Sequence, residues 1–234
     1  MNDFLIQYYS LVTHSVEALA AFTGLLLYRK YKDSTAKYFI YFLFYSTLCD
    51  TLGSYTKYVK NDGFLSFLDG TLFQKNYWWY TLFWSVFSIV FYTFYYNKII
   101  KNIKFKSVIK YSGYAFLLFS VGYIIINFDS YFKTSLPPIS VFGALIIFLC
   151  TVFYFIEILL SDTILVFYKS LNFYISITIF IWWLIITPLG FFERYFFTSD
   201  WDFVFLKWQI YLFANIFMYL TFTFALIWCR PQNE

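Results

Sequence analysis

Charged residues are scarce in this chain of 234 residues. Asp, Glu, Lys and Arg together make up 13% of it, against roughly 25% in a typical soluble domain, whereas 61% of the chain is hydrophobic. A water-soluble fold cannot bury that much apolar surface, so a soluble globular protein is excluded. Long apolar runs separated by short charged stretches are present instead. They predict an all-α polytopic membrane protein, because backbone polar groups in lipid are satisfied within a helix.

Cysteine, histidine and glycine are also rare, with three, one and eight residues respectively. Cys49, Cys150 and Cys229 each fall within or at the end of an apolar stretch, which argues against a disulfide framework or a CxxC metal site and favours small buried hydrophobic residues. The N-terminus lacks a basic n-region, so we expect the first apolar stretch to stay in the membrane.

Aromatic residues are abundant, at 28% of the chain with 34 Phe and 24 Tyr. This enrichment is typical of an AT-rich coding sequence such as those of AT-rich bacterial genomes, so aromatic clusters are not taken as evidence for a cofactor. No cofactor is specified by the sequence. We expect a multi-pass protein of the cell membrane, in a bacterium the inner membrane.

Seven apolar stretches have the length of a membrane span. At a rise of about 1.5 Å per residue, about 18 to 25 residues cross a hydrocarbon core of about 30 Å. Because the longest loop, about 57–76, is too short for a soluble domain, the prediction is a single seven-helix transmembrane domain over residues 1–234. The predicted spans are 4–28, 38–56, 77–97, 111–128, 139–160, 171–192 and 204–228.

The distribution of basic residues predicts the orientation. Eleven of the 17 Lys and Arg residues fall in loops on one side of this topology and six on the other. The positive-inside rule therefore places the N-terminus outside and the C-terminus in the cytoplasm.

Five lysines fall in the predicted cytoplasmic loop 97–110. We expect this loop to lie against anionic lipid headgroups as a topology determinant or to contact a cytoplasmic or membrane protein partner. Nucleic-acid binding is poorly supported, because no folded basic domain presents these side chains. The five are Lys98, Lys101, Lys104, Lys106 and Lys110.

Polar and small residues share one face of the first span. Residues three and four apart on a helix are neighbours, so Ser10, His14 and Glu17 form a stripe that continues through Ala21 and Gly24. Ionisable and small side chains inside a membrane turn toward the bundle interior or a water-filled cavity. We therefore expect this stripe to face protein.

A similar stripe in the second span contains Ser46, Asp50 and Ser54. Consecutive antiparallel spans normally pack together, so we predict a cluster of His14, Glu17 and Asp50 in the outer half of the bundle. Because an ionisable group at the bilayer centre costs about 2.5 to more than 10 kcal/mol, the cluster is interpreted as a ligand, ion or proton site. Since histidine changes charge near neutral pH, such a site would respond to pH. The alternative is a polar contact that only fixes helix packing.

Three further polar or kinking features occur in later spans. Glu157 either reaches the interface, if the fifth span ends near residue 160, or becomes a second buried site candidate, if the span continues toward Lys169. Pro188 predicts a kink in the sixth span. Asn215 and Gln209 are expected to form hydrogen bonds between helices in the seventh.

Three seven-span families were compared with the sequence, and the residues that each requires are missing. Microbial rhodopsins need a lysine in the middle of the last span, where this chain has only Lys207 at the entrance. Zinc amidohydrolases of the alkaline ceramidase type need several histidines, and His14 is alone. G-protein-coupled receptor motifs are absent after the third span and in the seventh. His14, Glu17 and Asp50 offer nitrogen and oxygen ligands for a metal, but the sequence gives little support for such a site because a second histidine is missing.

The sequence thus favours a receptor-like or sensor-like membrane protein that is not an enzyme and that acts through a partner. A transporter or proton-coupled channel component is the first alternative. An intramembrane metal-dependent enzyme is the second, although the sequence contains no convincing pair of nucleophile and base.

Overall fold

The computed structural model describes residues 2–59, 63–192 and 201–231, and this part of the chain is helical with no strand. The principal helices are α1 (Asn2–Leu26), α2 (Tyr28–Tyr31), α3 (Ala36–Gly53), α4 (Tyr77–Trp79), the π-helix η4 (Tyr80–Val86), α5 (Phe87–Ile99), α6 (Ile103–Ile126), α7 (Phe128–Lys133), α8 (Pro137–Leu159), α9 (Leu171–Phe192) and α10 (Trp201–Trp228). Short 3₁₀ helices are η1 (Ser54–Tyr58), η2 (Ser66–Leu68), η3 (Leu72–Gln74), η5 (Asp162–Leu165) and η6 (Phe167–Lys169).

Within the described residues, four helices are long and apolar enough to cross a membrane. They correspond to α6, α8, α9 and α10, over Ile103–Ile126, Pro137–Leu159, Leu171–Gly190 and Phe203–Trp228. The all-helical class is therefore confirmed, and these four helices support a membrane location. The other three predicted spans coincide with α1, with α3 and with the continuous segment α4–η4–α5. That all seven segments cross the bilayer stays a prediction.

The predicted basic loop 97–110 is wrong in its extent. Helix α5 continues to Ile99 and α6 already begins at Ile103, so only residues 100–102 connect them. Asn102 caps α6, because its side-chain oxygen accepts hydrogen bonds from the backbone N–H groups of Lys104 and Phe105, at 2.9 and 3.4 Å. Lys104, Lys106 and Lys110 consequently lie on α6 itself and Lys98 on α5.

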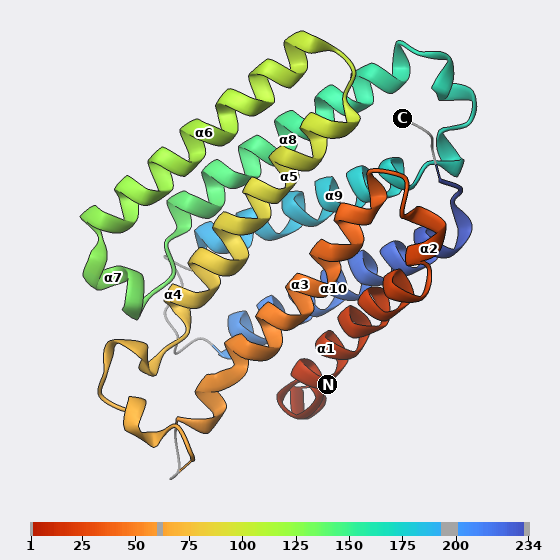
Figure 1. The fold of residues 1–234 in the computed structure, drawn as a ribbon. Helices are drawn as coiled ribbons and strands as arrows, with labels where there is room; N and C mark the ends of the chain where they lie inside the picture. Colours follow the sequence, from red (N-terminus) through yellow and green to blue (C-terminus); the bar gives the residue numbers. More distant parts are fainter. Residues whose placement is uncertain (1, 60–62, 193–200, 232–234) are drawn as a thin grey trace.

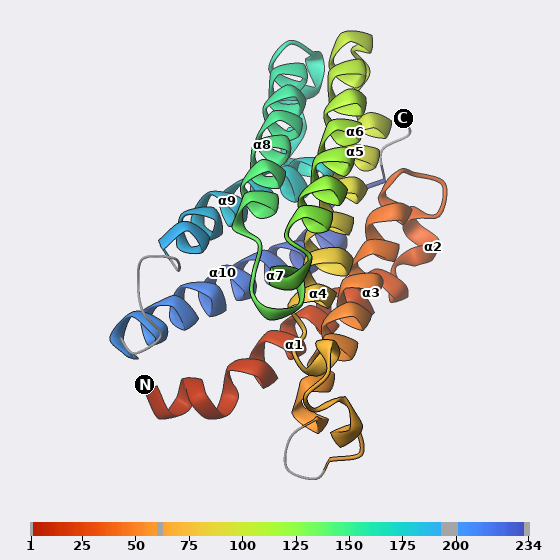
Figure 2. The ribbon, with the colours of Figure 1, turned by 90° about the vertical axis from the view of Figure 1, so that its left-hand side faces the viewer.

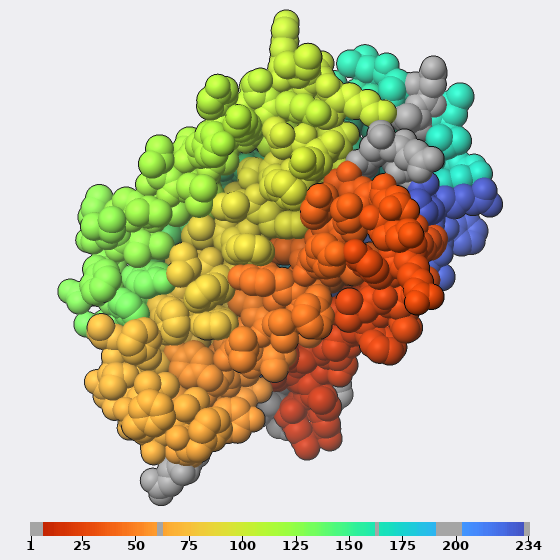
Figure 3. All heavy atoms as spheres, in the orientation of Figure 1, coloured from red at the N-terminus to blue at the C-terminus, as the bar shows by residue number. Residues whose placement is uncertain are grey.

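The helices pack as two groups. Helix α1 lies between α3 and α10, and α10 also packs against α9; α5, α6 and α8 form the second group. The groups are joined where α8 meets α9 and α3 meets α5 (Figures 1 and 2). Side chains of α1, α3, α5 and α6 fill the face seen in Figure 3. Apolar α6 residues such as Leu118 remain exposed, as expected beside lipid.

Buried tyrosines connect α5 to α9 through hydrogen bonds. Tyr95 donates to Asn172 Oδ1 at 2.6 Å, and Tyr96 donates to Ser176 Oγ at 2.7 Å. Both rings are fully buried, so these contacts combine a large apolar area with a satisfied hydroxyl. The three cysteines are buried as expected.

The predicted cytoplasmic segments gather at one end of the bundle. Figure 1 shows α2, the α5–α6 connection and the end of α10 there, while α7 and the start of α1 lie at the opposite end. Lys60 and Arg194, which the predicted topology places on the outer side, lie outside the described residues.

Helix α2 closes the end of α10. The Lys30 ammonium donates to the carbonyls of Leu226 and Ile227 at 3.1 and 3.0 Å, and the Tyr31 hydroxyl donates to those of Leu226 and Cys229, each at 2.9 Å. Carbonyls at a helix C-terminus have no partner within the helix, so α2 satisfies them. Burial lowers the pKa of Lys30 and raises the pKa of Cys229 to about 11.

Candidate functional site

Ser10, His14, Ser54 and Lys57 form a polar chain between α1 and η1. Lys57 donates to Ser10 Oγ at 3.0 Å, and His14 Nδ1 lies 2.6 Å from the Ser10 carbonyl oxygen. Because a carbonyl only accepts, Nδ1 must carry the proton in this contact. The other ring nitrogen, Nε2, lies 3.5 Å from Ser54 Oγ. Ser10 and His14 of the first predicted stripe therefore meet Ser54 of the second, and Lys57 joins them.

Glu17 is the most deeply buried of the predicted site residues, with 1% of its surface exposed. Its Oε1 accepts a hydrogen bond from the Tyr219 hydroxyl of α10 at 3.0 Å, whereas its Oε2 meets no donor. Asp50 of the adjacent helix α3 is the acidic neighbour of Glu17. Neither carboxyl forms an ion pair with a described lysine or arginine.

Two carboxylates offer only acceptors to each other. A hydrogen bond between Glu17 and Asp50 therefore requires that one of them carry a proton. We refer to Glu17 and Asp50 as the acidic pair, because two neighbouring carboxyl groups disfavour the ionisation of both. Such a pair can retain a proton, release it, or bind a cation beside it.

Small residues allow the helices that carry this pair to approach closely. A Cβ atom added to Gly24 of α1 would lie 3.2 Å from the Ile40 side chain of α3. A Cβ atom added to Gly53 would lie 2.8 Å from the Tyr80 ring. The predicted stripes thus face protein as expected, with Glu17, Ala21 and Gly24 buried.

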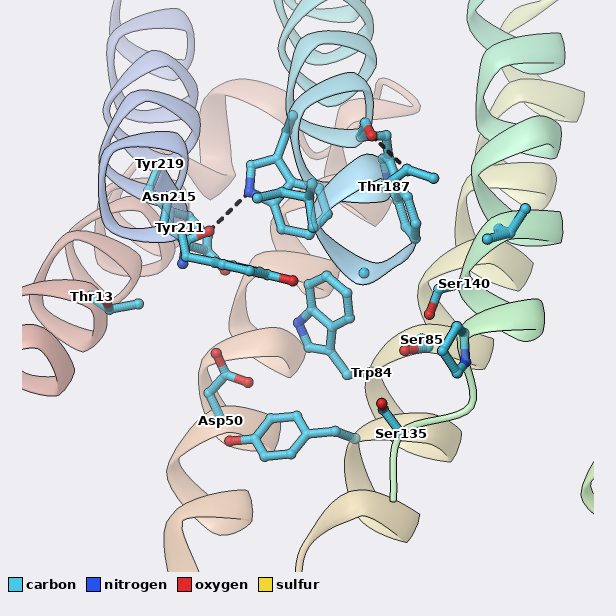
Figure 4. A pocket seen from close by; sticks show the side chains of 17 residues that line it. Thr13, Asp50, Trp84, Ser85, Ser135, Ser140, Thr187, Tyr211, Asn215 and Tyr219 are labelled. Atoms are coloured by element: carbon cyan, nitrogen blue, oxygen red, sulfur yellow. Dashed lines mark hydrogen bonds between the residues drawn. The ribbon is translucent and has the colours of Figure 1, made fainter. Parts of the chain in front are cut away.

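A cavity of about 290 Å³ opens beside Asp50. In Figure 4 the side chains of Asp50, Trp84 and Tyr211 point toward a common space from α3, η4 and α10. The wall also contains Thr13, whose buried Oγ1 has no hydrogen-bonding partner. The volume is close to the lower end of the range of about 300–1,000 Å³ that is usual for small-molecule pockets. The remaining lining residues are Tyr80, Ser85, Ser135, Pro137, Ser140, Val141, Trp182, Trp183, Ile186, Thr187, Gly190, Asn215 and Tyr219.

Trp84 reaches the cavity from a π-helical segment. Seven residues of η4, Tyr80–Val86, have π-helical geometry within an otherwise α-helical segment. The carbonyl of Phe83 in this segment accepts a hydrogen bond from the Tyr45 hydroxyl of α3 at 2.6 Å. Because π-helical turns are rare and frequently occur at functional sites, this irregularity at the cavity wall supports a site here.

Glu157 lies at the other end of the bundle from the acidic pair. Helix α8 ends at Leu159, and the Glu157 carboxylate accepts the backbone N–H groups of Lys101 and Asn102 at 2.7 and 3.0 Å. It therefore fastens the α5–α6 connection to the end of α8. Its contacts give it a structural role.

Sequence reasoning missed the aromatic wall of the cavity and the role of α10. Trp84, Trp182 and Tyr211 had no signal that distinguished them from the many other aromatic residues. Tyr219 lies far from Glu17 in the chain, and only the packing of α1 against α10 brings them together. The expected bond between helices at Asn215 is confirmed, because Trp182 Nε1 donates to its Oδ1 at 2.9 Å. Pro188, at which the sequence predicts a kink, lies inside α9.

In the described part of the chain, no three His, Cys, Asp or Glu residues are grouped so that they could hold a metal ion. No protein-family model matches the chain, and no curated protein or solved structure matches it either.

Proposed function

We propose that this protein is a membrane receptor or sensor that binds a small molecule in the cavity beside Asp50. The observation that carries the proposal is the cavity with Asp50 in its wall, where Asp50 has no cationic ion-pair partner among described residues; Glu17, whose Oε2 has no donor, is buried on the adjacent helix α1. A buried charge without an ion-pair partner is energetically costly, so a bound ligand would supply the partner that the protein lacks. Asp50 is the proposed ligand contact in the cavity wall, and Ser10, His14, Glu17 and Ser54 are the proposed polar site residues behind it.

A partner is needed to convey the signal. The four lysines around the α5–α6 connection, Lys98, Lys101, Lys104 and Lys106, form a basic end on the predicted cytoplasmic side. This end is proposed to contact an acidic partner protein or the anionic membrane surface.

The binding proposal is tested with the full chain in lipid nanodiscs. A library of small metabolites is screened for compounds that raise the thermal unfolding temperature, because a ligand that binds only the folded state stabilises it. We expect hits that stabilise the wild type and no longer stabilise the Asp50→Asn variant. A matched control, Asp129→Asn, changes an exposed aspartate at the start of α7 and should respond like the wild type. Hits that stabilise all three proteins equally would contradict the proposal.

A second candidate function is a transporter or proton-coupled channel component. The polar chain Lys57–Ser10–His14–Ser54 supports it, because it leads from an exposed lysine to the backbone of Asp50. Proteoliposomes with an internal pH-sensitive dye would test this candidate. Proton uptake that depends on His14 and Asp50 would favour transport, and its absence would favour the receptor.

A further inference from the structure

We infer that the cavity takes a small organic cation, an ammonium compound whose positive charge lies between Asp50 and the tryptophan rings. The inference rests on the proposed binding function and names the chemical class of the ligand.

Aromatic rings form a large part of the cavity wall. Three of them, Trp84, Trp182 and Trp183, are close neighbours: the ring centroids of Trp84 lie 5.4 Å from those of Trp182 and 6.5 Å from those of Trp183. The indole N–H of Trp182 is already bonded to Asn215. Tryptophan is the aromatic residue that attracts cations most strongly, and several rings around one space are the usual receptor for an ammonium group.

The formal charge in the cavity wall is negative only. Asp50 lines the cavity, and the lining includes no lysine, arginine or histidine among the described residues. Asp50 is the only acidic side chain among the described lining residues. A monovalent cation matches it, whereas an anionic ligand would meet only repulsion from Asp50.

An organic cation fits this wall better than a bare metal ion. Hard metal ions require about six to eight oxygen ligands at short distance. Here one carboxylate stands among aromatic rings and a few hydroxyls, including Thr13 Oγ1 without a partner. Ring faces and scattered hydroxyls suit the methyl or methylene groups of an ammonium compound and a hydroxyl attached to it.

The experiment compares two probes of nearly equal shape. Choline and its neutral carbon isostere, 3,3-dimethylbutan-1-ol, are titrated into the full chain in nanodiscs by isothermal calorimetry. We expect choline to bind about tenfold or more tightly than the isostere, since a desolvated cation–π contact contributes about 2 kcal/mol or more. Trp84→Leu and Asp50→Asn should each weaken choline binding by a similar factor.

Matched controls change the same residue types away from the cavity. Trp228→Leu alters an exposed ring at the end of α10, and Asp129→Asn alters an exposed carboxylate. Both should bind choline like the wild type. If Asp50→Asn does not fold, the two probes and Trp84→Leu still decide the inference.

The outcomes separate the ligand class from the function. Equal binding of choline and the isostere, or stabilisation only by neutral or anionic library compounds, would overturn the cation inference and leave the binding function standing. If neither the cations nor any library compound binds, both proposals fail. Binding of Na⁺ or K⁺ in place of choline would assign the cavity to inorganic ions and also overturn the inference.

Discussion

Glu17 and Glu157 show how the role of one residue type depends on what its two oxygens face. Glu157 accepts two backbone N–H groups, so both of its oxygens are used as acceptors. Glu17 accepts one hydroxyl at Oε1, and its Oε2 is buried without a hydrogen-bonding partner. The same substitution should therefore have opposite consequences at the two positions.

We predict that Glu17→Gln keeps or raises stability and that Glu157→Gln lowers it. A glutamine at position 17 keeps an oxygen that accepts from Tyr219 and replaces the unpaired buried Oε2 by a neutral amide group, whereas at position 157 the amide N–H₂ would face a backbone N–H. A hydrogen bond to a charged group contributes about 1.5–3 kcal/mol, and the partly exposed position of Glu157 places the loss toward the lower end of this range. Chemical unfolding in detergent micelles would measure the difference between the two variants.

Glu17→Ala is the control for packing at this position, because it removes the partner of Tyr219 as well as the charge. It should destabilise more than Glu17→Gln. Equal damage by Glu17→Gln and Glu17→Ala would contradict this prediction.

At the scale of helices, the absence of a side chain at Gly53 allows α3 to pack closely against the Tyr80 ring. Because a Cβ atom there would lie 2.8 Å from the Tyr80 ring, Gly53→Ala must displace a ring that lines the cavity. Overpacking of this kind costs about 1–3 kcal/mol. We expect a lower unfolding temperature for Gly53→Ala, measured by differential scanning fluorimetry with the full chain.

Gly122→Ala provides the comparison. It is also a helical glycine, on α6, and an added Cβ atom there would meet nothing within 4 Å. We expect no loss of stability for this variant. A similar loss at both glycines would show that backbone effects, and not contact with Tyr80, set the cost.

Helix positions were more predictable than helix ends. Apolar runs of about twenty residues give the segments, because length and hydrophobicity are local properties. The start of α6 was predicted eight residues too late. The first turns of α6 contain several lysines, a composition that is typical of a loop. The only signal for the start of the helix is the capping side chain of Asn102.

At the scale of the molecule, the orientation is tested with single cysteines and a membrane-impermeant thiol reagent. Ser66→Cys should be labelled from outside intact cells, and Lys104→Cys only after the membrane is opened. The wild-type chain is the control, because its three cysteines are buried and should stay unlabelled. Labelling of Lys104→Cys in intact cells would reverse the topology.

Only part of the candidate site was predictable from the sequence. Sequence stripes on two consecutive helices were enough to bring His14, Ser54 and Asp50 together, since short connections make such helices neighbours. The contribution of α10 depends on how the chain closes on itself, and no local pattern contains that information. Tyr219 and the tryptophan wall therefore emerge only from the assembled bundle.

The three neighbouring indoles also give the protein an intrinsic spectroscopic probe. Trp84 comes from η4 and the pair Trp182 and Trp183 from α9, with 5.4 Å between the ring centroids of that pair. At this separation their electronic transitions couple, and the resulting near-ultraviolet circular dichroism depends on the angles between the rings and on fixed tertiary packing. A sliding of α9 past the π-helical segment would thus change an optical signal in the unmodified protein, without an attached dye.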